Sequence, residues 1–158
     1  MAAPVFPSDP CAVAETLLAR TGEAYMTGDF DAFAACFALP QWIETFDGRR
    51  QIANRADLKA LFDGVRTSFC RKGVTDLVRR CVAARWHDAN TIEATHETRL
   101  LAGAQLLHPS YPCLTILTRG PAGWQIAGGQ YAVSDALFDL GVQQDARPAS
   151  SPSSHTGV

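Results

Sequence analysis

Hydrophobic residues at helical spacing characterise the first part of the chain. From Ala14 to Tyr25, apolar or small residues recur three and four positions apart, which places them on one face of an α-helix. Residues 8–10, Ser-Asp-Pro, supply a capping oxygen and a proline suited to the first helical turn. We therefore predict a first helix, which Gly28 can end by adopting the left-handed conformation.

A second, shorter helix is predicted directly after this glycine, with Asp29 as its cap. Pro40 should end it, because proline lacks an N–H and clashes with the preceding turn. Residues 41–46 have the pattern of a strand, and the Asp-Gly pair at 47–48 would turn the chain back into a short strand over 49–52. The apolar face of the second helix comprises Phe30, Phe33, Ala34 and Phe37.

A third helix is predicted between Asn54, which can cap its first turn, and Gly73, which can end it. Its apolar stripe is wide enough to need a sheet or another helix as cover. The stripe comprises Leu58, Leu61, Phe62, Val65 and Phe69.

The rest of the chain has the pattern of strands over residues 75–86, 91–101, 106–118 and 123–132, separated by short turn sequences. Short links join strands as antiparallel hairpins, and Gly128-Gly129 favours a bulge or bend in the last one. The predicted fold class is α+β, with three N-terminal helices packed in a strongly bent antiparallel sheet that forms a cone around an internal pocket. Residues 134–140 could add one helical turn over the pocket mouth or the sheet edge.

Length and composition indicate a single domain over residues 9–141, preceded by an arm over 1–8 and followed by a tail over 142–158 with few large apolar residues. His155 falls in this tail and is expected to be solvent-exposed. The net charge of -2, from 14 basic and 16 acidic residues, gives no basic footprint for nucleic acid. The pairs Arg71-Lys72 and Arg79-Arg80 are interpreted as solvated faces.

The five cysteines are widely spaced, without a CxxC pair. Buried thiols in a reducing compartment explain this pattern better than a disulfide framework or a zinc site. The sequence shows neither a basic start followed by an apolar core nor an apolar run of about 18 residues. We therefore expect a cytoplasmic protein without membrane contact, metal or cofactor.

A long helix, a Gly-Asp-aromatic corner at residues 28–30, a short helix ending in Phe-Ala-Leu-Pro, a strand and an Asp-Gly hairpin together resemble the start of the NTF2-like superfamily. Its SnoaL-like and ketosteroid-isomerase-like members share this opening. The resemblance extends over residues 54–73 as the third helix and reaches Gly-Trp-Gln-Ile at 123–126 as the last strand. The superfamily includes enzymes, ligand binders and interaction modules, so fold alone does not assign a function.

Ketosteroid-isomerase-like enzymes combine a carboxylate base with a tyrosine and a protonated aspartic acid that stabilise an enolate. The resemblance places these three positions at Thr45, Thr21 and Cys113. All three depart from the pattern, and threonine is no base at neutral pH while a thiol is a weak donor. The resemblance therefore argues against this isomerisation, unless the neighbouring Glu44 turns inward.

Two residues are candidates for acid–base chemistry. Glu44 is the nearest carboxylate to the expected base, although alternation places it with Trp42 and Phe46, opposite Ile43 and Thr45. His96 belongs to the more apolar face of its strand, which should point into the cone, where an imidazole can transfer protons near neutral pH. A core histidine and an outward or dimer-facing glutamate are the alternatives.

A few polar residues are expected to line the pocket among apolar ones, which is the usual make-up of a small-molecule site. The sequence lacks the motifs GxSxG, GxxxxGK[ST], HExxH and GxGxxG. Ordinary core packing is the alternative for each candidate. The predicted ligand-binding residues are Thr21, Tyr25, Thr45, Tyr111, Cys113 and Gln130.

We therefore predict an NTF2-like domain whose pocket binds a small apolar or aromatic molecule. One alternative is a cofactor-free SnoaL-like isomerase, cyclase or hydrolase that uses His96 or Glu44 as its acid or base. A second alternative is a non-catalytic homodimeric interaction module. Many relatives pair through the sheet, and Trp42 on its outer face favours a homodimer of this kind.

Overall fold

The computed structural model describes residues 9–140. The predicted arm over 1–8, the predicted tail over 142–158 and residue 141 lie outside the described residues. The helices are α1 (Pro10–Thr27), α2 (Phe30–Ala34), α3 (Arg55–Lys72) and the 3-10 turn η1 (Asp135–Phe138). The strands are β1 (Phe37–Thr45), β2 (Gly48–Ile52), β3 (Asp76–Asp88), β4 (Thr91–Ala102), β5 (Gln105–Leu106), β6 (Tyr111–Gly120) and β7 (Gly123–Tyr131).

The two long helices begin and end at the predicted signals. The Asp9 side chain accepts a hydrogen bond from the Cys11 backbone N–H at 3.0 Å, and Asn54 caps α3 in the same way. Gly28 and Gly73 end the helices with φ of 80° and 68°, values that favour glycine. Within residues 9–140, no helix has both the length and the apolar composition needed to cross a membrane.

The strands form one curved sheet in the order β2-β1-β7-β6-β4-β3, with β5 paired to β4. The predicted hairpins are antiparallel, but β1 pairs with β7 in parallel, so the sheet is mixed. A hairpin rule cannot predict this pair, because β1 and β7 are far apart in the chain. The sheet does not close into a barrel, since β2 and β3 end its pairing order.

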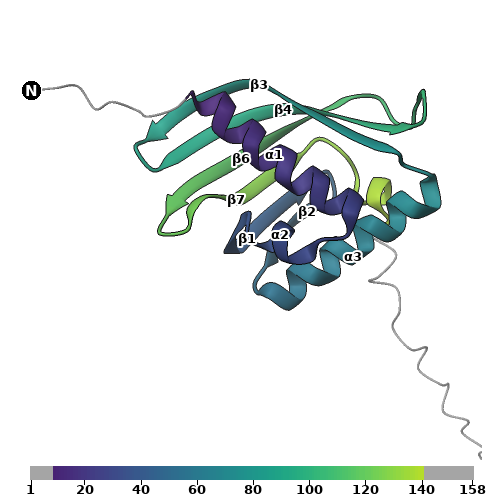
Figure 1. Ribbon diagram of the computed structural model, residues 1–158, viewed down its shortest axis with the longest axis horizontal. Coiled ribbons are helices and arrows are strands. Elements are labelled where there is room, and N and C mark those ends of the chain that lie inside the picture. The colour runs from purple at the N-terminus through teal and green to yellow at the C-terminus, as the bar shows by residue number, and fades with distance from the viewer. Residues whose placement is uncertain (1–8, 141–158) are drawn as a thin grey trace, which may run out of the picture.

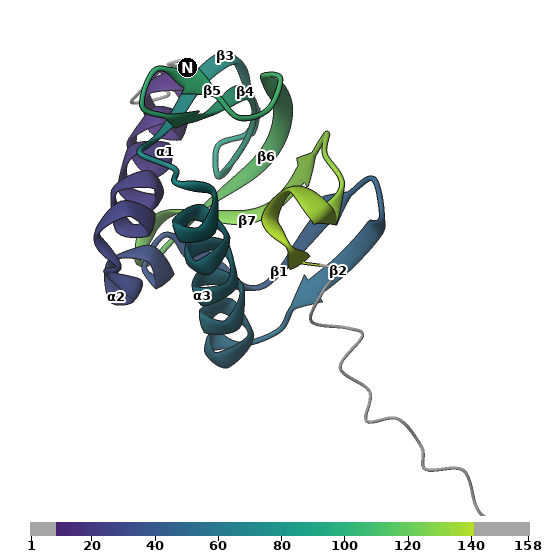
Figure 2. The same cartoon turned by 90° about the vertical axis from the view of Figure 1, so that its right-hand side faces the viewer.

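The helices lie on the concave side of the sheet. Figure 1 shows α1 across the strands, and Figure 2 shows the sheet curving from β3 around α1 and α3 to the β1–β2 hairpin. The apolar stripe predicted for α3 faces inward, with Leu58, Phe62, Val65 and Phe69 buried. The predicted inner row of β4 is also buried, namely Ile92, Ala94, His96, Thr98 and Leu100.

The chain leaves the second helix earlier than predicted. α2 ends at Ala34, and Phe37 is the first residue of β1 instead of the last of a helical face. Phe37 pairs with Ile126 of β7, so sheet pairing determines the conformation here. Pro40 lies inside β1, between the two stretches that pair with β7, where its missing N–H removes no bond to that strand.

The strand predicted over residues 106–118 is split in the structure. β5 folds back on β4, with Leu106 opposite Leu101. β6 begins at Tyr111, which lies opposite Thr98, and pairs with β4 back to Thr91. Pro109 lies between the two pieces, and a proline there supplies no N–H for a continuous ladder.

Gly128 and Gly129 give two rings room on opposite faces of β7. A Cβ on Gly128 would lie 2.3 Å from Cε2 of Trp42 on the outer face, and one on Gly129 would lie 3.0 Å from the ring of Tyr131 on the inner face. The predicted irregularity is present beside them, because the β6–β7 register shifts between Ile116 and Leu117. The glycines therefore permit close ring packing as well as curvature.

Candidate functional site

An internal cavity lies between the concave sheet face and the helices. It leaves about 90 Å³ open to the centre of a water molecule, well above the roughly 10–15 Å³ that one water needs. Most of its wall is aromatic or aliphatic. The apolar wall includes Leu18, Phe33, Phe37, Ile43, Leu61, Val65, Phe69, Leu77, Ile126, Phe138 and Leu140.

Five predicted residues meet at this cavity. Thr21 and Tyr25 reach it from α1, Thr45 from β1, His96 from β4 and Tyr111 from β6. Helical spacing brings the first two to one face of α1, and strand alternation turns the others inward. The five come from elements far apart in the sequence, so the fold is what brings them together.

The turn predicted after residue 133 borders this cavity. Phe138 and Leu140 contribute to the wall there. Asp135 holds the turn, because it accepts a hydrogen bond from the Thr45 hydroxyl at 2.8 Å and pairs with Arg50 at 2.5 Å. The turn therefore lies at the pocket, which is one of the two positions predicted for residues 134–140; the other was the sheet edge.

Two predicted ligand-binding residues lie away from the cavity wall. Gln130 is exposed on the outer face, because alternation along β7 turns it opposite to Tyr131, which lines the cavity. Cys113 is buried, but it packs with Tyr111 and Val133 instead of reaching the cavity. Tyr131 belongs to the cavity wall although the sequence analysis did not select it.

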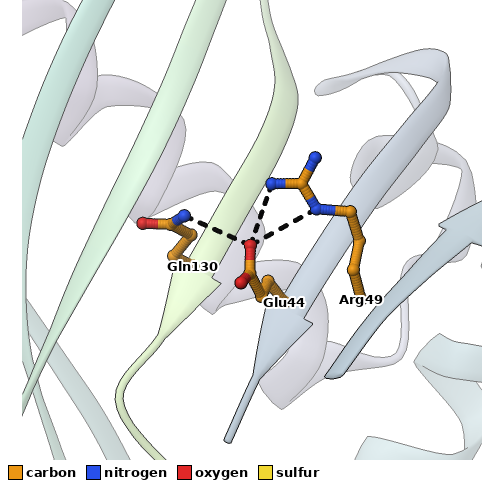
Figure 3. A network of polar contacts seen from close by, with 3 residues as sticks. All are labelled: Glu44, Arg49 and Gln130. Atoms are coloured by element: carbon orange, nitrogen blue, oxygen red, sulfur yellow. Dashed lines mark hydrogen bonds and ion pairs between the residues drawn. The ribbon is translucent and has the colours of Figure 1, made fainter. Parts of the chain in front are cut away.

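Glu44, one of the two predicted acid–base residues, also lies on the outer face. Its Oε2 accepts hydrogen bonds from Arg49 Nη2 at 2.9 Å and from Gln130 Nε2 at 3.2 Å. Figure 3 shows these side chains meeting from β1, β2 and β7. Both contacts lower the pKa of Glu44, led by the bond from Arg49. Glu44 is therefore a paired surface carboxylate, and it does not face the cavity.

His96 lies in the cavity wall and is 3% exposed. Its Nδ1 is 3.4 Å from the Thr115 hydroxyl. Burial, assisted by the positive charge of Arg79, lowers the pKa of His96 to about 4. The imidazole is therefore neutral at physiological pH, where it can donate or accept one hydrogen bond but cannot serve as a cationic acid.

Three tyrosines place hydroxyl groups around the cavity. Tyr25 stacks on Phe62 with ring centroids 5.4 Å apart. Burial raises the pKa of Tyr25 and Tyr111, and it raises the pKa of Tyr131 to about 12. All three phenols are consequently neutral and can donate a hydrogen bond. Within residues 9–140, the hydroxyls of Tyr25 and Tyr131 take part in no hydrogen bond.

Among the described residues, Arg79 contributes the one charged side chain in this wall, and the interpretation of Arg79-Arg80 as a solvated pair is wrong for its first member. Arg79 lies opposite the buried Thr98, and its Nη2 donates to the Leu18 carbonyl at 2.5 Å and to the Thr21 hydroxyl at 2.7 Å. Arg80 is exposed. The signal was present in the sequence, because alternation puts Arg79 on the same face as Leu77 and Cys81.

Among residues 9–140, no aspartate or glutamate lines the cavity. Within the described part of the chain, no group of three or more His, Cys, Asp or Glu side chains is placed to hold a metal ion. The polar groups that line the cavity are therefore one cation, a neutral imidazole and several hydroxyls. Such a wall can recognise an electron-rich oxygen by hydrogen bonds, but it offers no carboxylate for proton abstraction.

Solved structures resemble this architecture along most of the chain. A domain of unknown function with a cystatin-like fold from Nostoc punctiforme has a TM-score of 0.62 at 19% identity, covering 87% of this chain and 86% of that one. An NTF2-like protein with a cystatin-like fold from Novosphingobium aromaticivorans has a TM-score of 0.60 at 20% identity, covering 80% and 85%. The chain has the NTF2-like fold.

A ketosteroid isomerase-like protein from Erwinia carotovora also resembles this NTF2-like chain, with a TM-score of 0.57, 18% identity and coverage of 79% and 96%. No family model and no curated protein matches the sequence. At these identities the similarity shows the fold alone. Function therefore has to be argued from the side chains in the cavity.

Proposed function

We propose that the cavity of this NTF2-like fold is a binding site for a small apolar or aromatic molecule. The observation that carries the proposal is a mostly apolar wall into which Arg79, Tyr25, Tyr131 and His96 bring hydrogen-bonding groups. Small-molecule sites combine apolar surface for affinity with a few polar groups for orientation. The hydroxyls of Tyr25 and Tyr131 have no hydrogen-bond partner within residues 9–140, and a ligand in the cavity could supply one.

Binding is better supported than acid–base catalysis. Glu44, the expected carboxylate, is engaged by Arg49 on the outer face. His96 has a pKa lowered to about 4, which makes it a weak base at neutral pH. A SnoaL-like isomerase, cyclase or hydrolase therefore remains the second proposal, with His96 as its only cavity-facing candidate among the two residues predicted for that chemistry.

Native mass spectrometry of freshly purified protein tests the proposal, followed by denaturation and identification of released small molecules. We expect a co-purifying apolar or aromatic compound. Leu61 lines the cavity from α3, so Leu61→Trp should fill the space and abolish the adduct. Ala56→Trp on the exposed side of the same helix is the matched control. An adduct that persists in folded Leu61→Trp protein would contradict binding at this cavity.

We also infer that the outer sheet face pairs two copies of the chain. Phe46 is 74% exposed at the β1–β2 turn and borders a groove on that face together with Pro112 and Leu114. An exposed aromatic beside a groove on the same surface suits a two-fold contact, in which each copy inserts into the other. Sedimentation at high concentration that shows only monomer would exclude this dimer.

A further inference from the structure

Arg79 is anchored with part of its guanidinium still available. Nη2 donates both hydrogen bonds of this side chain, one to the Leu18 carbonyl and one to the Thr21 hydroxyl. Gly22 permits this position, since a Cβ there would lie 3.0 Å from the same nitrogen. Within residues 9–140, no hydrogen bond uses Nε or Nη1 of Arg79. The N–H groups of Nε and Nη1 are therefore free to donate singly to a ligand oxygen, although both two-nitrogen edges of the guanidinium include the occupied Nη2.

The guanidinium also lacks a negative partner. None of the ion pairs within the described residues involves Arg79. Glu15, Glu23 and Asp76 border a surface groove between α1 and β3 that Arg79 also lines, but none of these carboxylates forms an ion pair with it within residues 9–140. Arg79 is half-buried, so its cation loses part of its hydration without gaining a paired counter-ion, and the guanidinium stays protonated.

The remaining polar groups around this cation are uncharged and can donate hydrogen bonds. The pKa of Tyr25, Tyr111 and Tyr131 is raised chiefly by burial, while the charge of Arg79 opposes the shift in each. These phenols consequently keep their protons beside the guanidinium. A cation together with neutral O–H donors is complementary to an anion with two acceptor oxygens.

The geometry points to a small monocarboxylate with an apolar or aromatic body as the ligand of this cavity, its carboxylate bound by a free N–H of the Arg79 guanidinium and by the hydroxyls of Tyr25 and Tyr131. This inference rests on the proposed function and adds the charge of the ligand to it. Arg79 would act as the specificity-determining residue, while the phenyl and aliphatic wall accommodates the body of the ligand. A single cation matches a single negative charge, so dicarboxylates should be excluded.

A purely structural role for Arg79, joining β3 to α1, gives different expectations. It accounts for the two bonds from Nη2, but not for charge selectivity in ligand binding. Two matched pairs of probes separate the roles, benzoate with benzamide and isobutyrate with isobutyramide. Each pair keeps size and shape while removing the negative charge.

Isothermal titration at pH 7.5 of the full chain should show each carboxylate binding about tenfold or more tightly than its amide. Arg79→Met should remove this preference, and Arg79→Lys should retain part of it. Arg80→Met is the matched control, because Arg80 is the exposed neighbour on the opposite face. Circular dichroism establishes that each variant is folded, and if Arg79→Met is not, Tyr131→Phe should still weaken the carboxylate selectively.

The outcomes separate this inference from the proposed function. Equal binding of acid and amide, unchanged in the Arg79 variants, would overturn the carboxylate assignment while leaving a neutral-ligand cavity intact. Binding of neither pair, together with protein that carries no adduct in native mass spectrometry, would overturn both. Selective carboxylate binding that is retained in folded Arg79→Met protein would place the anion elsewhere and also overturn the inference.

Discussion

Polar side chains on the two faces of the sheet differ in whether they have a partner of opposite charge. On the outer face, Glu44 is satisfied by Arg49 and Gln130, and Arg85 pairs with Glu93 at 2.5 Å. On the inner face, Arg79 has no carboxylate partner within residues 9–140. The outer polar side chains bind one another, whereas the inner ones line the cavity.

This difference shows where a functional site can be sought in a fold that supports many functions. A charged residue on the surface can find a partner or water at little cost. A polar residue inside the concave face needs a compensating contact, and a ligand can supply it. Adjacent residues illustrate the contrast, since Arg79 and Arg80 share a type but face opposite sides of β3.

The strongest test on the inner face is the dependence of stability on pH at His96. The pKa of His96 is lowered from 6.5 to about 4 in the folded protein. Between these values the unfolded chain binds the proton and the folded one does not, so stability is full above pH 6.5 and falls as the pH drops towards 4. The gap corresponds to about 3 kcal/mol.

Urea unfolding of wild type and His96→Gln at pH 7.5, 5.5 and 4.5 measures this effect. The variant should lose stability less steeply over the range. Glu44, Asp88 and Asp139 have lowered pKa values of their own and contribute equally to both proteins. Parallel curves for the two proteins would show that His96 takes up its proton in the folded state.

A smaller effect is expected from the ring that lies on the outer side of β7. Gly128→Ala places a Cβ where Trp42 lies and should cost about 2 kcal/mol through overpacking. Gly120→Ala is the control, since its Cβ would have no atom within 4 Å. In the double variant Trp42→Ala with Gly128→Ala, the loss in free energy of unfolding should be smaller than the sum of the two single losses. If the losses simply add, contact with the Trp42 ring does not cause the destabilisation by Gly128→Ala.

The smallest effect is expected at Glu44 on the same outer face. Glu44→Gln retains an acceptor for Arg49 and removes a charge that is paired in solvent. The thermal midpoint should stay within experimental error of wild type, and so should the affinity for any ligand of the cavity, because Glu44 does not line it. A large loss of ligand affinity, measured by titration beside Thr45→Val, would show that Glu44 acts in the cavity after all.

Local signals in the sequence predict much of this fold. Asp9, Gly28, Asn54 and Gly73 act within one helical turn, so their roles could be predicted without knowledge of distant residues. Alternation along β4 likewise identified the inner position of His96. Phe37 could not be placed in this way, because its pairing partner Ile126 lies far along the chain.

The candidate site was predicted less completely than the fold. Thr21 and Thr45 were selected through the family resemblance, Tyr25 and Tyr111 as polar residues expected at the pocket, and all four line the cavity. Arg79 was missed because its charge was given more weight than its place in the alternation. Glu44 and Gln130 were selected by proximity to the expected pocket, yet residues adjacent along a strand point to opposite sides.

The parallel pairing of β1 with β7 also has a consequence for folding during synthesis on the ribosome. Glu44 and Gln130 meet across this contact although they are 86 residues apart. The hairpin of β1 and β2 consequently cannot join the main sheet until the last strand has left the exit tunnel. Folding of the curved sheet is therefore completed after synthesis of nearly the whole domain, and a chain released before residue 123 keeps the edge of β1 open to other chains.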